Sequence, residues 1–332
     1  MTLLFIGGTG NISADCAALL HRQGHAVGVL TRGNTLIPSE YKRLQGDRRK
    51  ADDLRSAVES FRPEIVINFL GYELSDVQLD FEILRDRVVQ YIFISSTTVY
   101  QKPPLRVPIT EDTPLGNAWW DYAQKKVECE QWLETVKGGF PTTILRPSHT
   151  YSHRWIPNPI ASSNYSFAAR LEQGKPVFIP DAGENPWTIT AASDFAAGLA
   201  GLVGNPKAIG EDFHLTSDEV LTWNQIYAEI ASALEAPVPE IVPIPTEFIC
   251  DAAPELTGNL KGDKAHPGVF DNSKIKKVVP DFRAIKPFAT GIRESVNWLR
   301  AHPDQKVLNP NVDQMIDRVV NTWRETRTRM DP

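Results

Sequence analysis

The sequence predicts an α/β protein with a doubly wound parallel sheet, followed by a smaller C-terminal domain. Two observations support this fold class. Within the first 150 residues, short apolar runs alternate with segments of helical periodicity, which is the pattern of repeated strand–helix–strand units. Beyond Pro147 the alternation stops and prolines become frequent, which indicates a change of architecture.

The expected strands are short and apolar on both faces, as in a parallel sheet that helices cover on both sides. They are residues 3–6, 26–30, 65–69, 91–95 and 142–145. The helices expected between them are residues 12–22, 52–61, 76–85 and 122–136. The crossovers between these strands should be right-handed.

The second half of the chain predicts a smaller domain that completes a cleft. Its expected helices are residues 161–173, 194–203, 223–234 and 292–302, and its expected strands are residues 176–179 and 213–215. We place the two domains at residues 1–150 and 151–332, with some later segments returning to the first. The last expected helix, 313–329, has an arginine-rich polar face, which is either solvated or a partner-binding surface.

The composition excludes several classes of protein. A hydrophobic fraction of 42% and a formal net charge of −6 over 332 residues are typical of a folded globular chain. An acidic chain without a basic block is a poor candidate for nucleic-acid binding. No apolar stretch approaches the ~18 residues that cross a membrane, and residues 1–7 do not resemble a secretory signal. Three widely spaced cysteines predict a reduced, cytoplasmic protein without disulfides.

A glycine-rich turn follows the first expected strand and opens a helix. Residues 7–13 read GGTGNIS. Gly7 allows a tight turn, and Gly10 lets the backbone approach a pyrophosphate that rests on the helix N-terminus. Ser13 stands where such turns often have a third glycine, and it is small enough for close helix–strand packing. In an alternating α/β chain, this motif predicts a dinucleotide cofactor held by Gly7, Thr9, Gly10, Asn11 and Ile12.

The residues after the second strand bear on which dinucleotide is bound. An NAD site usually has an acid there to accept from the ribose 2′-hydroxyl. This chain has Thr31 and Arg32, and a guanidinium suits a 2′-phosphate, so NADP(H) is favoured over NAD(H) unless Arg32 is a solvated surface residue. Asp47 and Arg48 follow a further short strand. Asp47 either accepts from the adenine amino group or belongs to a plain turn.

A second motif points to chemistry on the cofactor. Tyr122 and Lys126 lie one helical turn apart, so the phenol and the ammonium share a face. A nearby cation favours the phenolate and lowers the pKa of a tyrosine, as a base near neutral pH requires. The strand 91–95 is followed by Ser96, Thr97 and two further hydroxyl residues at its carboxyl end, where ligands bind in open α/β sheets.

Together these motifs resemble the extended short-chain dehydrogenase/reductase family, also called the NAD-dependent epimerase/dehydratase family. The resemblance covers nearly the whole chain and rests on GGTGNIS at 7–13, ISSTTVY at 94–100, Tyr122 with Lys126, LRPSHTY at 145–151, WTIT at 187–190, DFA at 194–196 and FHLTS at 213–217. It implies a Rossmann fold, with an NAD(P)-binding first domain and a substrate-binding second domain. It also implies that Tyr122 is the catalytic acid/base, that Lys126 lowers its pKa and binds ribose, and that Ser96 orients the substrate oxygen. Further cofactor contacts are expected from Leu70, Gly71, Lys126, Pro147 and His149.

Departures from the family pattern narrow the expected reaction. Sugar-nucleotide dehydratases have an Asp-Glu pair where this chain has Thr97 and Thr98. Sugar-nucleotide epimerases usually have two arginines that grip the pyrophosphate. Here Trp187 takes the first place, and only Lys261 or Lys264 is near the second. We therefore expect an NAD(P)-dependent oxidoreductase. An epimerase with tightly bound cofactor and a non-catalytic or RNA-binding relative are the alternatives.

The expected partner is a small-molecule substrate, with neither nucleic acid nor a membrane. Thr97, Trp120, His149 and Trp187 are candidates for contacting it, and Trp119 and Trp155 are further candidates for an aromatic wall; some of these tryptophans belong instead to the core. His149 either faces the nicotinamide or the substrate, or is a turn histidine bonded to backbone. No residues have metal-ligand spacing. The connection 70–91 is shorter than the family's, so we expect a monomer or a homodimer.

Overall fold

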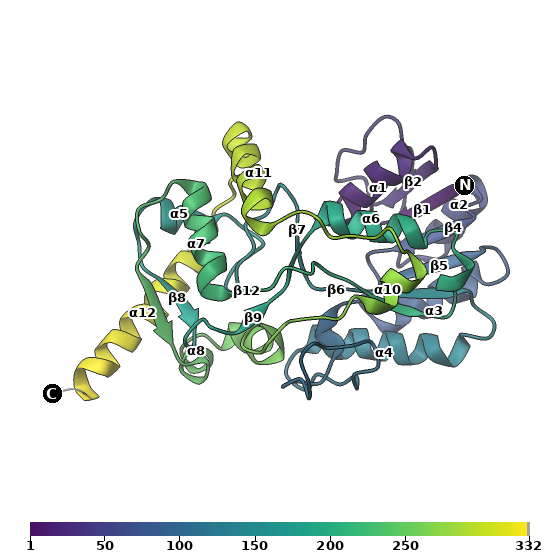
Figure 1. Cartoon of the computed structure of the whole chain (residues 1–332). Coiled ribbons are helices and arrows are strands. Elements are labelled where there is room, and N and C mark those ends of the chain that lie inside the picture. The colour runs from purple at the N-terminus through teal and green to yellow at the C-terminus, as the bar shows by residue number, and fades with distance from the viewer. Residues whose placement is uncertain (331–332) are drawn as a thin grey trace.

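A computed structural model of the chain describes residues 1–330. Its centre is a parallel seven-stranded sheet with the order β11-β6-β5-β4-β1-β2-β3, which confirms the expected fold class (Figure 1). The strands are β1 (Thr2–Ile6), β2 (Ala26–Thr31), β3 (Lys42–Gln45), β4 (Ile65–Asn68), β5 (Gln90–Ile94), β6 (Thr142–Pro147) and β11 (Asp212–Leu215). The chain leaves β1 toward β2 on one side and later returns to β4 on the other. This reversal of strand order opens a crevice at the carboxyl ends of β1 and β4.

Helices cover both faces of the sheet, and β1 shows why. Its alternate side chains point to opposite faces, so Leu3 and Phe5 join one apolar cluster while Leu4 and Ile6 join another. The first cluster packs under α1 (Ser13–Arg22) and α6 (Ala192–Leu202). The second packs under α2 (Ala51–Phe61), α3 (Leu74–Leu84) and α4 (Asp121–Val136). Apolar strands with no polar face therefore require this three-layer arrangement.

The second half forms a smaller body beside the sheet (Figure 1). Its strands are β7 (His149–Tyr151), β8 (Val177–Pro180), β9 (Pro186–Trp187), β10 (Ile189–Ala191), β12 (Leu221–Thr222) and β13 (Ile241–Ile244). Its main helices are α5 (Ser166–Glu172), α7 (Trp223–Leu234), α8 (Thr246–Ala252), α11 (Phe288–Ala301) and α12 (Pro310–Met330). Shorter elements are α9 (Thr257–Asn259), α10 (Ser273–Val278), a π-helix at Leu260–Lys264 and single turns of 3₁₀-helix at Thr97–Val99, Pro206–Ala208, Pro254–Leu256 and Pro303–Gln305. The domain boundary near residue 150 stays a prediction, and β11 and α6 are late segments packed with the first half.

Two expected helices begin elsewhere, for identifiable reasons. The helix expected at 161–173 begins only at Ser166, because the Asn158 side chain accepts hydrogen bonds from the backbone N–H groups of Ile160 (3.0 Å) and Ala161 (2.7 Å) and holds a turn there. The helix expected at 292–302 begins one turn earlier, at Phe288. Its N–H donates to the Glu219 carboxylate at 2.7 Å, which satisfies a free donor of the first turn. Among residues 1–330, no helix is both long enough and apolar enough to cross a membrane.

Candidate functional site

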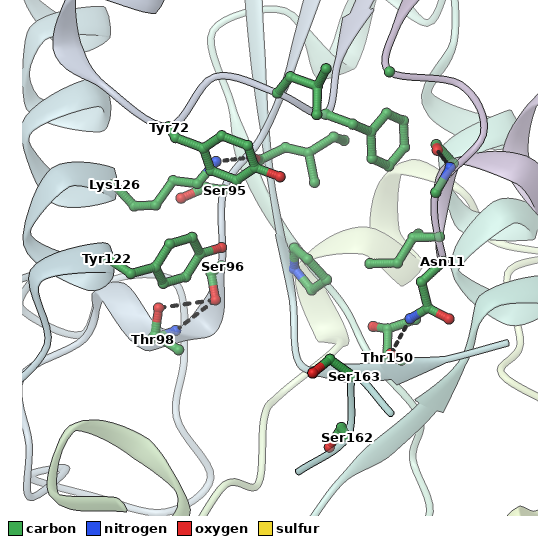
Figure 2. Close-up of a pocket in the computed structure, with 18 of the residues that line it drawn as sticks. Asn11, Tyr72, Ser95, Ser96, Thr98, Tyr122, Lys126, Thr150, Ser162 and Ser163 are labelled. Atoms are coloured by element: carbon green, nitrogen blue, oxygen red, sulfur yellow. Dashed lines mark hydrogen bonds between the residues drawn. The ribbon is translucent and has the colours of Figure 1, made fainter. Parts of the chain in front are cut away.

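A cavity of about 1090 Å³ lies at the carboxyl ends of the central strands, between the two halves of the chain. It is lined by loops that follow β1 to β6 and by the segment that includes Leu256 and Lys264. Most of the residues that the sequence assigned to the cofactor line this cavity, namely Gly7, Thr9, Gly10, Asn11, Ile12, Thr31, Arg32, Asp47, Arg48, Leu70, Lys126, Pro147 and His149. Figure 2 shows the side chains that point into it from α4, from the end of β5 and from the turn after β1.

The turn after β1 has the shape that a closely approaching pyrophosphate needs. Gly7 has φ +84°, and a Cβ at this position would lie 2.6 Å from the Leu70 side chain. A residue with a side chain is therefore excluded by backbone strain and by space. The Gly10 N–H donates to the Ser13 hydroxyl at 2.8 Å, so Ser13 fixes the turn as well as filling the place of a third glycine. Asn11 ties the turn to the second half, since its amide donates to the Thr150 carbonyl at 2.7 Å (Figure 2).

The rim beyond β2 and β3 would face the adenosine end of a dinucleotide. Arg32 is exposed and lines the cavity. Arg48 also lines it, but its guanidinium is buried and paired with Asp76 and Asp80, each at 2.5 Å. This pairing was not predicted from the sequence, and it means that the Arg48 guanidinium holds Asp76 and Asp80 of α3. Asp47 lines the cavity, and its carboxylate accepts from the Arg49 N–H at 3.0 Å.

The three residues predicted to carry the chemistry lie together. Tyr122 and Lys126 project from one face of α4, and Ser96 lies opposite them, two residues past the end of β5 (Figure 2). The Lys126 ammonium is buried and donates to the backbone carbonyls of Gly71 (2.8 Å) and Ile94 (2.7 Å). Gly71 does not line the cavity; its place in the site is as an acceptor for Lys126. The lysine is thereby held between the ends of β4 and β5.

Burial dominates the protonation of this cluster. It raises the pKa of Tyr122 well above the ordinary value, and the neighbouring Tyr72 adds to the rise, while a hydrogen bond with Ser96 opposes it. Burial also lowers the pKa of Lys126 to about 8. Its ammonium lies 6.0 Å from the centre of the Tyr122 ring. The phenol is therefore protonated near pH 7, in contrast to the lowered pKa that the Tyr–Lys spacing suggested.

The Ser96 hydroxyl is oriented by its neighbour. Both the backbone N–H and the hydroxyl of Thr98 donate to Ser96 Oγ, at 3.2 and 3.0 Å (Figure 2). A serine hydroxyl has two lone pairs and one proton. With both lone pairs engaged, Ser96 can act only as a donor toward a third group. Thr98 thus prepares Ser96 to donate to an oxygen in the cavity.

The tryptophans divide between wall and core. Trp120 and Trp155 line the cavity. Trp187 does not line the cavity, because it is fully buried and its ring centre lies 5.1 Å from that of Trp223. The prediction that Trp187 contacts the substrate is therefore wrong. Trp119 is 49% exposed and also lies outside the cavity. A glycine neighbour explains the burial of Trp187, because a Cβ on Gly268 would lie 2.8 Å from its ring.

Thr97 and His149 line the cavity as well. The His149 Nε2 lies 3.1 Å from the Ser162 hydroxyl, so its partner is a side chain and the backbone bond considered for it is not formed there. Burial lowers the pKa of His149 well below the ordinary value, and the charge of Lys264 lowers it further. His149 is accordingly a neutral imidazole.

Some residues that line the cavity were not predicted from the sequence. Tyr72 follows β4, and its ring centre lies 6.3 Å from that of Tyr122 and 5.1 Å from the Lys126 ammonium. Asp263 is buried, pairs with Lys264 at 2.5 Å and lines the far end of the cavity with it. The only sequence signal for Tyr72 was its position at the carboxyl end of a strand. Within residues 1–330, no group of three or more His, Cys, Asp or Glu side chains could hold a metal ion.

Comparison with known proteins identifies a family and several relatives. The sequence model of the NAD dependent epimerase/dehydratase family matches residues 3–215. A chloroplast stem-loop binding protein of 41 kDa from Arabidopsis thaliana is 28% identical over an alignment of 262 residues, which covers 74% of this chain and 67% of that protein. The 2′-dehydrokanamycin reductase of Streptomyces kanamyceticus is 25% identical over an alignment of 295 residues, which covers 85% of this chain and 80% of that one.

Solved structures share the fold. A crystal structure of UDP-glucose 4-epimerase from Bifidobacterium longum, in complex with NAD⁺ and UDP, superposes with a TM-score of 0.75. The match covers 92% of this chain and 100% of that one at 20% sequence identity. The family and fold that the sequence predicted are therefore confirmed.

Proposed function

Since the chain belongs to the NAD dependent epimerase/dehydratase family, a family of enzymes, we propose that it is an NADP(H)-linked oxidoreductase acting on a carbonyl or hydroxyl group of a small molecule. One observation carries the proposal. A single cavity joins the glycine turn at Gly7, which suits a dinucleotide, to Tyr122, Ser96 and Lys126, which suit proton transfer to an oxygen.

Each residue has a distinct part in the proposed reaction. When bound, the nicotinamide cofactor supplies or accepts the hydride. Tyr122, protonated near neutral pH, donates its proton to the substrate oxygen as a carbonyl is reduced, and takes it back in the reverse direction. Ser96 donates a hydrogen bond to the same oxygen and stabilises the charge that develops there. Lys126 holds the ribose and, through its two backbone acceptors, fixes the position of α4.

The substrate end favours a net oxidoreductase over a sugar-nucleotide epimerase. The two positions where the resemblance expects pyrophosphate-gripping arginines are filled by Trp187, which is buried in the core, and by the segment of Lys261. Lys261 pairs with Glu247 and lies outside the cavity. Lys264 does line the cavity, but as a partner of Asp263. A relative named 2′-dehydrokanamycin reductase supports the assignment as an oxidoreductase. Another relative is named UDP-glucose 4-epimerase, so an epimerase is the second candidate.

A purely RNA-binding role, suggested by the name of the chloroplast relative, has less support. The chain carries a net charge of −6, and phosphate backbones require cationic surfaces. Tyr122 and Lys126 are retained at the cavity. The three cysteines are all buried and free, which suits the reduced cytoplasmic location that we propose.

The preference for NADP(H) is tested by changing Arg32 to glutamine. We expect the affinity for NADPH to fall by about ten- to a hundredfold, because a charge-assisted contact with the 2′-phosphate is lost, while NADH binding stays unchanged. Fluorescence titration of the purified protein with both cofactors measures this. A wild-type protein that binds NADH more tightly than NADPH would overturn the proposed preference.

The lowered pKa of Lys126 predicts a pH dependence of cofactor binding. The ammonium form holds ribose oxygens better than the neutral amine, so binding should weaken as the pH rises through about 8. We expect the dissociation constant for NADPH to increase several-fold, by roughly threefold to tenfold, between about pH 7 and pH 9. Lys126→Met should bind weakly and without this pH dependence. A wild-type protein with a flat profile would contradict the role given to the ammonium.

A further inference from the structure

We propose that Arg49 is a second specificity residue, which grips the 2′-phosphate of NADP(H) together with Arg32. This inference rests on the proposed function, because it requires a phosphorylated cofactor. It starts from one observation: Arg32 and Arg49 both line the cavity, at the ends of two neighbouring strands.

The sheet brings these two arginines to the same rim. β2 and β3 are parallel, with Thr31 opposite Gln45. The backbone N–H of Gly46, the first residue after β3, donates to the Thr31 carbonyl at 3.0 Å. The chains therefore leave the sheet side by side. Arg32 is the first residue past β2, and Arg49 is the third past Gly46. Both belong to the end of the cavity where a dinucleotide bound on the glycine turn would place its adenosine.

The Arg49 guanidinium is more exposed and less engaged in ion pairs than that of Arg48. The Arg48 side chain is 6% exposed and is neutralised by Asp76 and Asp80 at 2.5 Å each. The Arg49 side chain is 61% exposed, and only its Nε approaches Asp76, at 3.5 Å. Within residues 1–330, no hydrogen bond engages either Nη group of Arg49 or the guanidinium of Arg32. Two guanidinium groups thus remain available to a ligand.

The charge of this rim suits a phosphate. Asp76 and Asp80 are already paired with Arg48, and Asp47 is the one acid among the described residues that lines this end of the cavity. The Asp47 carboxylate accepts from the backbone N–H of Arg49 at 3.0 Å. With Arg48, Asp76 and Asp80 included, this cluster has three guanidinium groups and three carboxylates, but Asp76 and Asp80 do not line the cavity. The charge that faces the cavity is therefore positive, since Arg32 and Arg49 are exposed there beside one carboxylate. A phosphate monoester, with about −1.5 to −2 charges at neutral pH, matches two guanidinium forks better than one.

Binding measurements test Arg49 without a known substrate. Isothermal titration calorimetry is performed on the full chain with NADPH and NADH, and with the fragments 2′,5′-ADP and 5′-AMP. We expect Arg49→Gln to raise the dissociation constants for NADPH and 2′,5′-ADP by about ten- to a hundredfold. The dissociation constants for NADH and 5′-AMP should stay within about twofold of the wild-type values. Arg49→Lys should bind NADPH and 2′,5′-ADP with affinities between those of the wild type and of Arg49→Gln, since lysine keeps the charge but loses the bidentate guanidinium contact.

Arg55→Gln is the matched control. Arg55 follows Arg49 in the next helix, α2, and is partly exposed; it pairs with Asp52 at 3.3 Å and lies outside the cavity. Its replacement should change none of the four affinities.

The outcomes separate the inference from the function on which it rests. If Arg32→Gln loses NADPH affinity while Arg49→Gln binds all four ligands like wild type, the role of Arg49 is wrong and the NADP(H) preference stands. If Arg49→Gln weakens the binding of NADPH and NADH equally, Arg49 acts through its contact with Asp76 of α3, and the inference is also wrong. If the wild-type protein does not prefer NADPH, the proposed preference fails, and the inference fails with it.

Discussion

Replacing Tyr122 by phenylalanine should lower kcat for the carbonyl substrate by about a hundred- to ten-thousandfold, the usual contribution of a positioned general acid. The substitution removes only the hydroxyl that faces the substrate oxygen. The ring contacts with Trp120, at 5.2 Å, and with Tyr72 are kept, so the fold and NADPH binding should change little. Steady-state kinetics with the substrate that the wild type reduces, combined with NADPH titration, measures both effects.

Tyr72 supplies the control for this prediction. Its phenol also lines the cavity, next to Tyr122, but it does not face Ser96 (Figure 2). Tyr72→Phe should therefore cost much less activity than Tyr122→Phe. If Tyr122→Phe turns over at the wild-type rate, or if the two variants lose activity equally, Tyr122 is not the proton donor.

Replacing Glu130 by alanine should destabilise the protein by about 3–5 kcal/mol, as expected when one partner of a buried ion pair is removed. Glu130 lies on α4, two turns beyond Tyr122, and is buried. It accepts from Arg146 of β6 at 2.6 Å and from the Ser95 hydroxyl at the end of β5. Without it, Arg146 keeps Asp212 at 2.7 Å, but a buried guanidinium loses its main acceptor. Denaturation in urea gives the free energy of unfolding for both proteins.

Glu134 offers a matched control for Glu130. It lies one turn further along α4, is exposed, and pairs with Lys137 at 3.2 Å. Exposed pairs of this spacing contribute about 0.5 kcal/mol or less, so Glu134→Ala should be nearly neutral. If Glu130→Ala lowers the free energy of unfolding by no more than Glu134→Ala does, the buried pair does not hold α4 against the sheet.

Local sequence signals were enough to predict the glycine turn and five strands of the sheet, β1, β2, β4, β5 and β6. The strand expected at 213–215 was assigned to the smaller domain, but it forms β11 at the edge of the central sheet. The strands are apolar on both faces, and a run such as β1 can be buried only between two helical layers. The turn at Gly7 was predictable because a glycine-rich run directly follows an apolar strand. In the structure, a positive φ and the nearby Leu70 side chain explain why this position needs a residue without a side chain. Helical spacing predicted that Tyr122 and Lys126 share a face of one helix, whereas their catalytic role was expected only from the resemblance to the family.

The remaining features depend on contacts between distant segments, which spacing does not encode. Trp187 lies in a segment expected near the cavity, yet it packs against Trp223 and Gly268 in the core of the second half. Arg48 was expected at the cofactor, but Asp76 and Asp80 of a later helix neutralise it. The raised pKa of Tyr122 likewise follows from burial, which only the folded arrangement determines.

The central claim is net hydride transfer with NADPH, and isotope transfer tests it most directly. The protein is incubated with NADPH deuterated at nicotinamide C4 and with a panel of cyclic ketones that includes 2′-dehydrokanamycin, the compound in the name of one relative. We predict that NADPH is consumed in proportion to an alcohol product that carries the deuterium. A product isomeric with its substrate, formed while the NADPH remains unconsumed, would contradict the account and indicate an epimerase.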